Sequence, residues 1–238
     1  MLNSSLVQEG LKKSGDWKYE TSAVRKSGIK FGGIKYMSFH IVADSCCELT
    51  ADMKKRENIE IAPLTLEVGG ESILDDETFD QKYFLKRVAE CPECPKSACP
   101  SPDYFRKSFL NGAERCYAVT LSAQLSGSYN SAVLGANLAQ EENEDLKIHV
   151  FNSRSASIGE TLIVKKIVEC EEAGMSFERV VETVELYIST QHTYFVLENL
   201  ETLRKNGRLS KTKALVASAL KIKPVMGSTP EGSICQLD

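Results

Sequence analysis

The sequence predicts an α/β fold in which helices flank a mainly parallel sheet, followed by a smaller α/β unit near the C-terminal end. Apolar, strand-like runs alternate with amphipathic, helix-forming segments from residue 39 onward. This alternation is typical of strand–helix–strand units, which build parallel sheets. The chain has 238 residues, of which 42% are hydrophobic. It is therefore long enough to bury one large core or two small ones.

Four apolar runs are the expected strands of the main sheet. They are Phe39–Ala43, Ile59–Val68, Tyr117–Ser122 and Lys147–Asn152.

The helices between these strands have recognisable ends. Ser101-Pro102 supplies an N-cap and a proline in the first turn, and Gly112 closes the same helix. A later helix runs through Ile163 and Ile167 and ends at Gly174. These signals place helices between strands, as a parallel sheet requires.

A second unit is expected after a helix at Phe177–Thr190. It contains a strand at Thr193–Glu198, a basic turn at Arg204–Arg208, a helix at Lys211–Leu220, and a hairpin of residues 223–226 and 233–237 around the turn Thr229–Gly232. The predicted division is thus an N-terminal domain at 37–190 and the start of a C-terminal domain at 191–238. Because the second hairpin strand has no further partner, we expect this C-terminal unit to be incomplete.

Residues 1–36 are rich in Lys, Gly and Ser and have little apolar periodicity. They are predicted to form a loose N-terminal extension. Met37 stands directly before the first strand, so an equally good explanation is that translation starts there.

Charge and composition exclude several classes of protein. The net charge is −4 and the cations are dispersed among acids, which argues against a nucleic-acid partner. No apolar stretch approaches the roughly 20 residues that span a bilayer, and no secretory signal opens the chain. We therefore expect a cytoplasmic protein with no integral membrane segment, and its eight cysteines are expected to be reduced thiols.

Cys91 and Cys94 have the C-x-x-C spacing of half a zinc site, with Cys99 nearby. A second pair with matching spacing is absent from the sequence. No metal and no cofactor are therefore expected, and the role of the three cysteines stays open.

The segment Thr120–Ala132 follows a predicted strand and opens a helix. Its hydroxyls, with Ser126 and Gly127 at the centre, lie where the free N–H groups of a helix N-terminus attract anions. The competing interpretation is that Ser126 only caps the helix. Two further polar turns, Ser97–Ser101 and Asp44-Ser45, also adjoin predicted strands or helices and could face the same crevice.

Several sequence blocks stand in a fixed order from about Phe39 to the end of the chain. They are Ile41–Ser45, Ile61–Thr65, Ser97–Pro102 with Phe105, Leu125–Ala132, Asn152–Ser157, Tyr194–Val196, Leu203–Ser210 and Lys221–Pro224. In this order the blocks resemble the DegV family.

This resemblance implies a protein that encloses one long-chain fatty acid between two domains and presents its carboxylate to a partner fatty acid kinase. Such a protein is a carrier and not itself a catalyst. The resemblance assigns the carboxylate-binding hydroxyls to Ser126 and Ser97, with Gly127 beside them. Asp44, Ser45 and Thr65 are candidate pocket residues from the other matching blocks.

The sequence departs from the family pattern at two places. Ala98 and Cys99 replace the Ser and Gln that usually follow the position of Ser97. The family also tends to place a carboxylate-facing His late in its C-terminal domain, and no His follows His192. This second departure fits an incomplete C-terminal unit.

Arg204 and Arg208 match the basic turn of the family and are candidates for contact with an acidic surface of the kinase. The alternative for this pair is a solvated turn between two helices.

Two other functions remain open. One is an acyl- or phosphoryl-transfer hydrolase that uses Ser126 or Asp44, although neither residue stands in a recognisable nucleophile motif. The other is a small-molecule sensor domain, which would use the same pocket.

Overall fold

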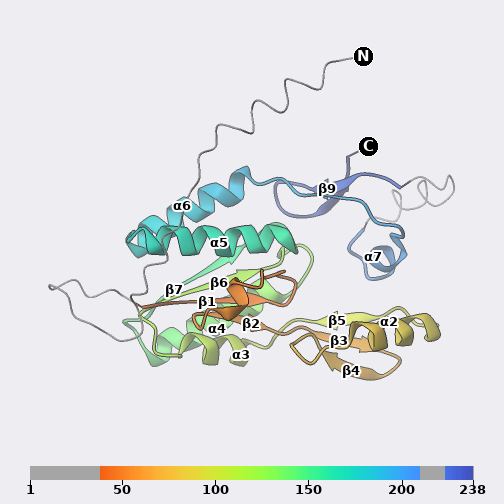
Figure 1. Cartoon of the computed structure of the whole chain (residues 1–238), viewed down its shortest axis with the longest axis horizontal. Helices are drawn as coiled ribbons and strands as arrows, with labels where there is room; N and C mark the ends of the chain where they lie inside the picture. The colour runs from red at the N-terminus through yellow and green to blue at the C-terminus, as the bar shows by residue number, and fades with distance from the viewer. Residues whose placement is uncertain (1–37, 210–222, 238) are drawn as a thin grey trace, which may run out of the picture. The chain divides into compact units, whose positions relative to one another are not determined.

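A four-stranded parallel sheet organises the computed structural model, which describes residues 38–209 and 223–237 (Figure 1). Its strands are β1 (Phe39–Asp44), β2 (Ile59–Ala62), β6 (Arg115–Thr120) and β7 (Lys147–Asn152), in the order β2-β1-β6-β7. β1 is parallel to both β2 and β6, and β6 is parallel to β7. The predicted fold class is confirmed for the described residues.

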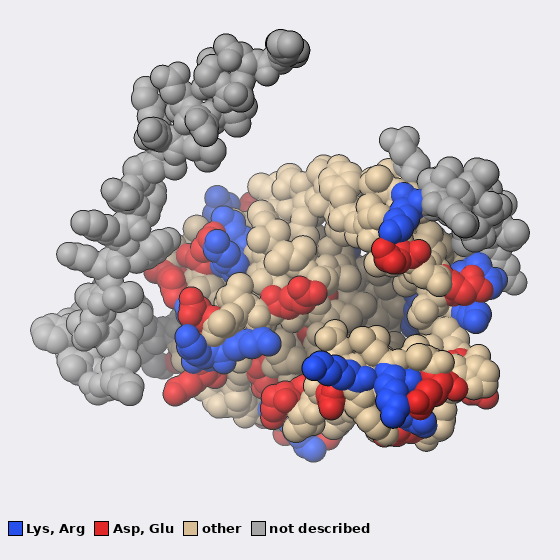
Figure 2. Space-filling view, turned by 45° about the vertical axis from the view of Figure 1, so that its right-hand side comes forward, with Lys and Arg blue, Asp and Glu red and all other residues tan. Residues whose placement is uncertain are grey.

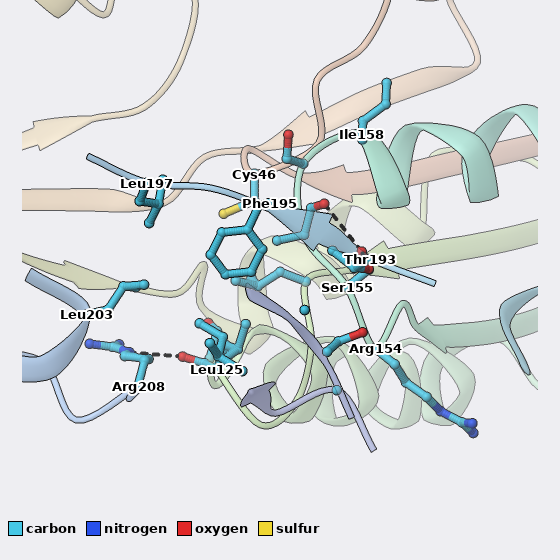
Figure 3. Close-up of a pocket in the computed structure, with 18 of the residues that line it drawn as sticks. Cys46, Leu125, Arg154, Ser155, Ile158, Thr193, Phe195, Leu197, Leu203 and Arg208 are labelled. Carbon is cyan, nitrogen blue, oxygen red and sulfur yellow. Dashed lines mark hydrogen bonds between the residues drawn. The ribbon is translucent and has the colours of Figure 1, made fainter. Parts of the chain in front are cut away.

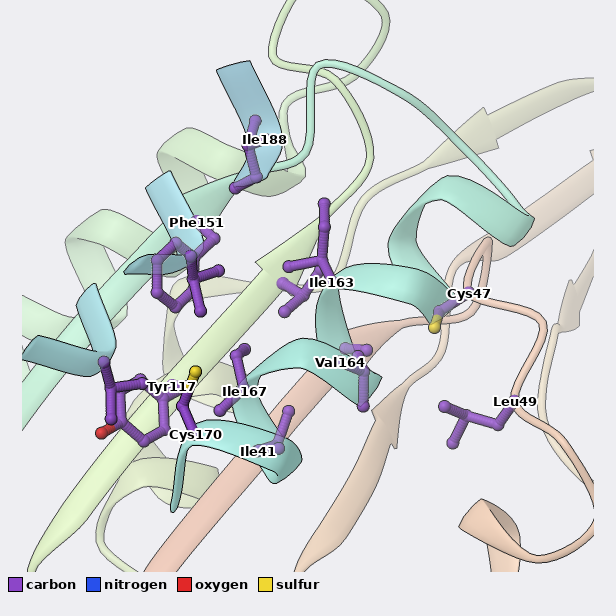
Figure 4. Packing of buried hydrophobic residues seen from close by; sticks show 14 residues of the cluster. Ile41, Cys47, Leu49, Tyr117, Phe151, Ile163, Val164, Ile167, Cys170 and Ile188 are labelled. Atoms are coloured by element: carbon purple, nitrogen blue, oxygen red, sulfur yellow. The ribbon is translucent and has the colours of Figure 1, made fainter. Parts of the chain in front are cut away.

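Helices cover both faces of this sheet. α5 (Ile158–Glu172) and α6 (Phe177–Thr190) pack on one face, where Ile41 and Tyr117 share a core with Ile163 and Ile188 (Figure 4). On the opposite face lie α3 (Pro102–Phe109) and α4 (Ser128–Glu142). Neighbouring residues of one strand point to opposite faces. Both faces of the sheet carry apolar side chains, because helices cover both of them.

A separate three-stranded antiparallel sheet follows β2. It contains β3 (Thr65–Val68), β4 (Glu71–Leu74) and β5 (Lys96–Ala98) in the order β4-β3-β5, with α2 (Gln81–Glu90) between β4 and β5 in the chain. The prediction of one strand over Ile59–Val68 is therefore wrong. Pro63, which has no N–H group for a ladder, lies at the break, and the chain changes sheets there.

The C-terminal part forms a third, antiparallel sheet of short strands. These are β8 (Tyr194–Phe195), β9 (Met226–Ser228) and β10 (Ile234–Gln236), in the order β10-β9-β8. α7 (Glu201–Lys205) lies between β8 and β9 in the chain, and the short 3-10 helix η2 (Met53–Lys55) follows β1. Leu209 and Met226 are buried in a small core there, with Phe195 and Ile234 packed against them.

The residues from Met37 onward group into one compact unit, separate from Met1–Tyr36. The proposed division between residues 190 and 191 stays a prediction, as does the incomplete C-terminal unit. The predicted helix Lys211–Leu220 and the predicted loose extension at 1–36 lie outside the described residues.

The distribution of surface charge and the length of the apolar helices both bear on function. Acidic and basic side chains are interspersed over the face in Figure 2, with no large area of one sign. Among the described helices, none is long and apolar enough to cross a membrane.

Candidate functional site

A cavity of about 520 Å³ lies at the carboxyl edge of the parallel sheet, where loops from the sheet meet residues of the segments 193–208 and 227–234 (Figure 3). Such a volume is within the range of about 300–1,000 Å³ typical of small-molecule sites. Most of the wall is apolar. Six of its apolar residues are Leu64, Leu121, Leu125, Phe195, Leu203 and Ile234.

Ser97 and Ser126 both line this cavity, although they come from different parts of the chain. Ser97 lies on β5, where it pairs with Leu66 of β3. Ser126 lies just before α4, and its Oγ accepts the Ser128 N–H at 3.2 Å and donates to Ser128 Oγ at 3.3 Å. The structure therefore brings the two predicted hydroxyls to one mostly apolar cavity, where they can donate to an anion.

Gly127, not Ser126, occupies the N-cap position of α4, and Ser126 Oγ accepts only the N–H of Ser128, the first residue of the helix. Gly127 is not among the cavity-lining residues. A Cβ atom on Gly127 would lie 3.2 Å from Cys99 Sγ. The close approach of these two residues explains why a small residue suits this turn.

The two predicted partner-binding arginines have different surroundings. Arg204 forms an ion pair with Glu201, one helical turn away. Arg208 lines the cavity, and its Nε donates to the Leu125 carbonyl at 3.2 Å (Figure 3). Arg208 is therefore held beside the Ser126 loop, a position that the sequence did not indicate.

Asp44, Ser45 and Thr65 are not among the residues that line the cavity. Asp44 is fully buried and accepts hydrogen bonds from the N–H groups of Leu121 at 2.9 Å and Cys46 at 3.1 Å. Burial raises the pKa of its carboxyl. Ser45 Oγ accepts the N–H of Leu64 at 3.1 Å and thereby holds the backbone of this wall residue in place. Thr65 lies in β3 and pairs with Leu74 of β4 and Ala98 of β5.

Contacts that the sequence did not reveal connect the C-terminal part to the sheet edge. Ser155 Oγ and Thr193 Oγ1 lie 2.7 Å apart, and Ser122 Oγ donates to the Gly232 carbonyl at 2.8 Å. A Cβ on Gly232 would lie 2.3 Å from Ser122 Oγ, and its φ is +93°. Of the residues in these contacts, Gly232 is the one that the local sequence singled out, because it ends the predicted turn Thr229–Gly232.

The described cysteines show no shared metal site at the C-x-x-C motif. Cys91, Cys94 and Cys99 do not belong to any group of described donor atoms close enough for one ion. Cys94 Sγ instead accepts from Asn206 Nδ2 at 3.6 Å. Asp44, Cys46 and Glu160 do bring donor atoms within 4.8 Å of one another. Asp44 and Glu160 are both fully buried, and burial raises the pKa of both carboxyls. Because a metal binds the ionised form of a carboxyl, we assign these two residues as an acid pair and not as metal ligands.

The family model described as "Uncharacterised protein, DegV family" matches residues 38–238. This chain belongs to the DegV family. A curated DegV domain-containing protein of Streptococcus pneumoniae is 36% identical over 200 residues, which are 83% of this chain and 71% of that protein.

Solved DegV structures have the same fold. A Ruminococcus gnavus DegV protein, refined with vaccenic acid, is 55% identical with a TM-score of 0.80, over 85% of this chain and 72% of that one. The Streptococcus pneumoniae fatty acid kinase (Fak) B3 protein, loaded with linoleic acid, is 35% identical with a TM-score of 0.77, over 85% and 72% of the two chains.

Proposed function

We propose that this DegV protein binds one long-chain fatty acid, with the acyl tail in the apolar part of the cavity and the carboxylate at Ser97 and Ser126. The observation that carries this proposal is the composition of the wall. Apolar side chains make up most of it, and the two serines from β5 and the α4 turn are the hydroxyl pair that the family resemblance assigns to the carboxylate. The fatty acids in the two neighbouring structures support the same ligand class.

The acyl tail and the carboxylate contribute differently to the binding free energy of such a complex. Each buried methylene contributes about 0.8 kcal/mol, so a tail of about sixteen carbons gains roughly 12 kcal/mol before association costs are subtracted. The serine hydroxyls need only replace the hydration of the carboxylate, which charge-assisted hydrogen bonds do. Affinity therefore comes mainly from the tail, and orientation comes from the serines.

The second part of the proposal is that the protein presents the bound carboxylate to a partner fatty acid kinase and is not itself an enzyme. The likeness to the Fak B3 protein supports the partner. Ser126 contacts Ser122 and Ser128 and has no contact with a described histidine, and His40 and His149 are each paired with a glutamate. Asp44 is fully buried. Both residues are therefore poorly placed to act as nucleophiles of a hydrolase.

Native mass spectrometry of gently purified protein tests the carrier function. We expect a mass increase that corresponds to one fatty acid, or the same increase after oleate is added to delipidated protein. Folded protein that shows only its own mass under both conditions would exclude the proposal. The kinase partner is tested separately, by following acyl phosphate formation with and without this protein.

A further inference from the structure

Two acidic side chains face each other below the cavity. Asp44, at the end of β1, and Glu160, in the first turn of α5, are both fully buried. One carboxylate oxygen of each residue lies within 4.8 Å of the other. Among the described residues, neither carboxyl forms an ion pair with a basic side chain. Two adjacent buried negative charges without a cation are very unfavourable, so one of the carboxyls must be neutral.

Hydrogen bonds identify which carboxyl holds the proton. Asp44 already accepts two backbone N–H groups, which favours its ionised form. Glu160 Oε1 accepts the Ser157 N–H at 3.2 Å, whereas Glu160 Oε2 faces no N–H or O–H donor among the described residues. An O–H at Oε2 that donates to Asp44 satisfies both groups. Burial and the neighbouring Asp44 both raise the pKa of Glu160 well above its ordinary value.

This pair connects loops that form the cavity wall. Asp44 accepts the N–H of Leu121, a wall residue at the start of the loop that carries Ser126. Glu160 forms a capping box with Ser157, another wall residue. The Ser126 N–H and Oγ in turn bond to Ser122 and Ser128 within that loop. The acid pair therefore adjoins both the loop that carries Ser126 and the start of α5.

We propose that Glu160 is a positioning residue, whose carboxylic acid proton holds Asp44 and thereby fixes the Leu121–Ser128 loop that presents Ser126 to the ligand. The proposal rests on the proposed fatty-acid function, because Ser126 is its point of action. It makes ligand binding depend on pH through a group that does not touch the ligand.

The surroundings of the pair offer nothing that would compensate for loss of the proton. The other titratable groups that act on this region are the thiols of Cys46 and Cys47 and the carboxyls of Glu48 and Asp75. Burial raises the pKa of Cys47 to about 12, so that thiol stays neutral. Because Glu160 has a higher pKa in the folded protein than in an unfolded chain, its contribution to stability is present at low pH and is lost as pH rises through the folded-state pKa.

The test compares the oleate affinity of wild type, Glu160→Gln and Glu171→Gln, by displacement of a fluorescent fatty acid from delipidated protein. It runs from pH 6 up to the highest pH at which all three proteins stay folded. We expect wild-type affinity to fall by about tenfold or more as the pair loses its proton, since one hydrogen-bonded contact to a charged group is worth roughly that factor. Glu160→Gln keeps a donor to Asp44 but has no proton to lose, so its profile should be flatter. Changes caused by oleate itself are common to all three proteins.

Glu171→Gln is the matched control, because Glu171 is another buried acid of α5 with a raised pKa, bonded to Tyr117 and Arg115 and absent from the cavity wall. Its profile should be parallel to that of wild type. Circular dichroism at each pH checks that the proteins are folded. Superimposable wild-type and Glu160→Gln profiles would overturn the positioning role while leaving fatty-acid binding intact. Failure of all proteins to bind oleate at every pH would instead refute the proposed function.

Difference infrared spectroscopy of the wild-type protein gives a second measurement that does not depend on a variant folding. We expect the C=O stretch of a protonated, buried carboxylic acid at pH 7, and we expect it to disappear at high pH. Absence of this band at pH 7 would show that the pair holds no proton and would overturn the proposal.

Discussion

Replacing Ser126 with alanine removes one hydroxyl from the cavity and changes little else in the fold. In the free protein, Ser126 Oγ accepts one backbone N–H, from Ser128, and donates weakly to Ser128 Oγ at 3.3 Å. A neutral hydrogen bond of this kind contributes about 0.5–1.5 kcal/mol to stability. We therefore expect Ser126→Ala to fold and to melt a few degrees below wild type.

The effect on ligand binding should be larger. A hydrogen bond to a charged group is worth about 1.5–3 kcal/mol, and each 1.4 kcal/mol changes affinity tenfold, so oleate should bind roughly 10- to 100-fold more weakly. Binding should persist, since the apolar wall that holds the tail is unchanged. Phosphorylation by the kinase should fall further, because phosphoryl transfer needs the attacking oxygen held in line with the donor.

Ser101→Ala is the matched control for this experiment. Ser101 Oγ caps α3 by accepting the Tyr104 N–H at 3.1 Å, and Ser101 does not line the cavity. It should lose about 1 kcal/mol of stability and bind oleate normally. Calorimetric titration with oleate and a coupled kinase assay measure both variants. If Ser126→Ala binds oleate and supports turnover like Ser101→Ala, then Ser126 is only a loop residue and the site assignment is wrong.

Three further substitutions test the geometry of the site and the core. Ser97→Ala should weaken oleate binding as Ser126→Ala does but more mildly, measured by the same titration. Gly232→Ala should release bound fatty acid faster in a dissociation experiment. The added Cβ would lie 2.3 Å from Ser122 Oγ, and the residue has a φ of +93°, which strains alanine. Unchanged retention of fatty acid would contradict the importance of the contact between Gly232 and Ser122. Gly135→Ala should lower unfolding stability by about 1–3 kcal/mol in urea, because its Cβ would lie 2.7 Å from Phe105 Cβ where α4 packs on α3; wild-type stability would show that the helices can move apart.

The main sheet was predictable because its strands are buried on both faces and its helices have strong end signals. β7 and α6 have the predicted bounds, and β6 begins two residues before the predicted start. The antiparallel sheet of β3, β4 and β5 was not predicted as such. β4 and β5 have only four and three residues, and none of these is buried, so they lack the apolar alternation on which a sequence-based prediction depends.

The site was only partly predictable. Hydroxyl-rich turns at strand and helix ends pointed to Ser97 and Ser126, and both line the cavity. Asp44 comes from a similar turn but does not line the cavity, because its carboxylate accepts the backbone N–H groups of Cys46 and Leu121. Side-chain direction after a strand depends on which backbone donors the fold leaves free. Phe195 and Arg208 reach the cavity only through packing of the C-terminal part, for which no local pattern exists.

The central position of β9 in the third sheet has a consequence for how the protein is made. β9 pairs with β8, which precedes it by about thirty residues, and with β10, which follows it. During synthesis, the strands and helices of the main sheet emerge first and domains fold largely from the N-terminal end. The cavity, however, needs Gly227, Ser228 and Ile234 in its wall. We therefore expect a nascent chain to fold its main sheet before the cavity wall is complete, so that a ligand of the cavity can bind only after β9 has joined β8.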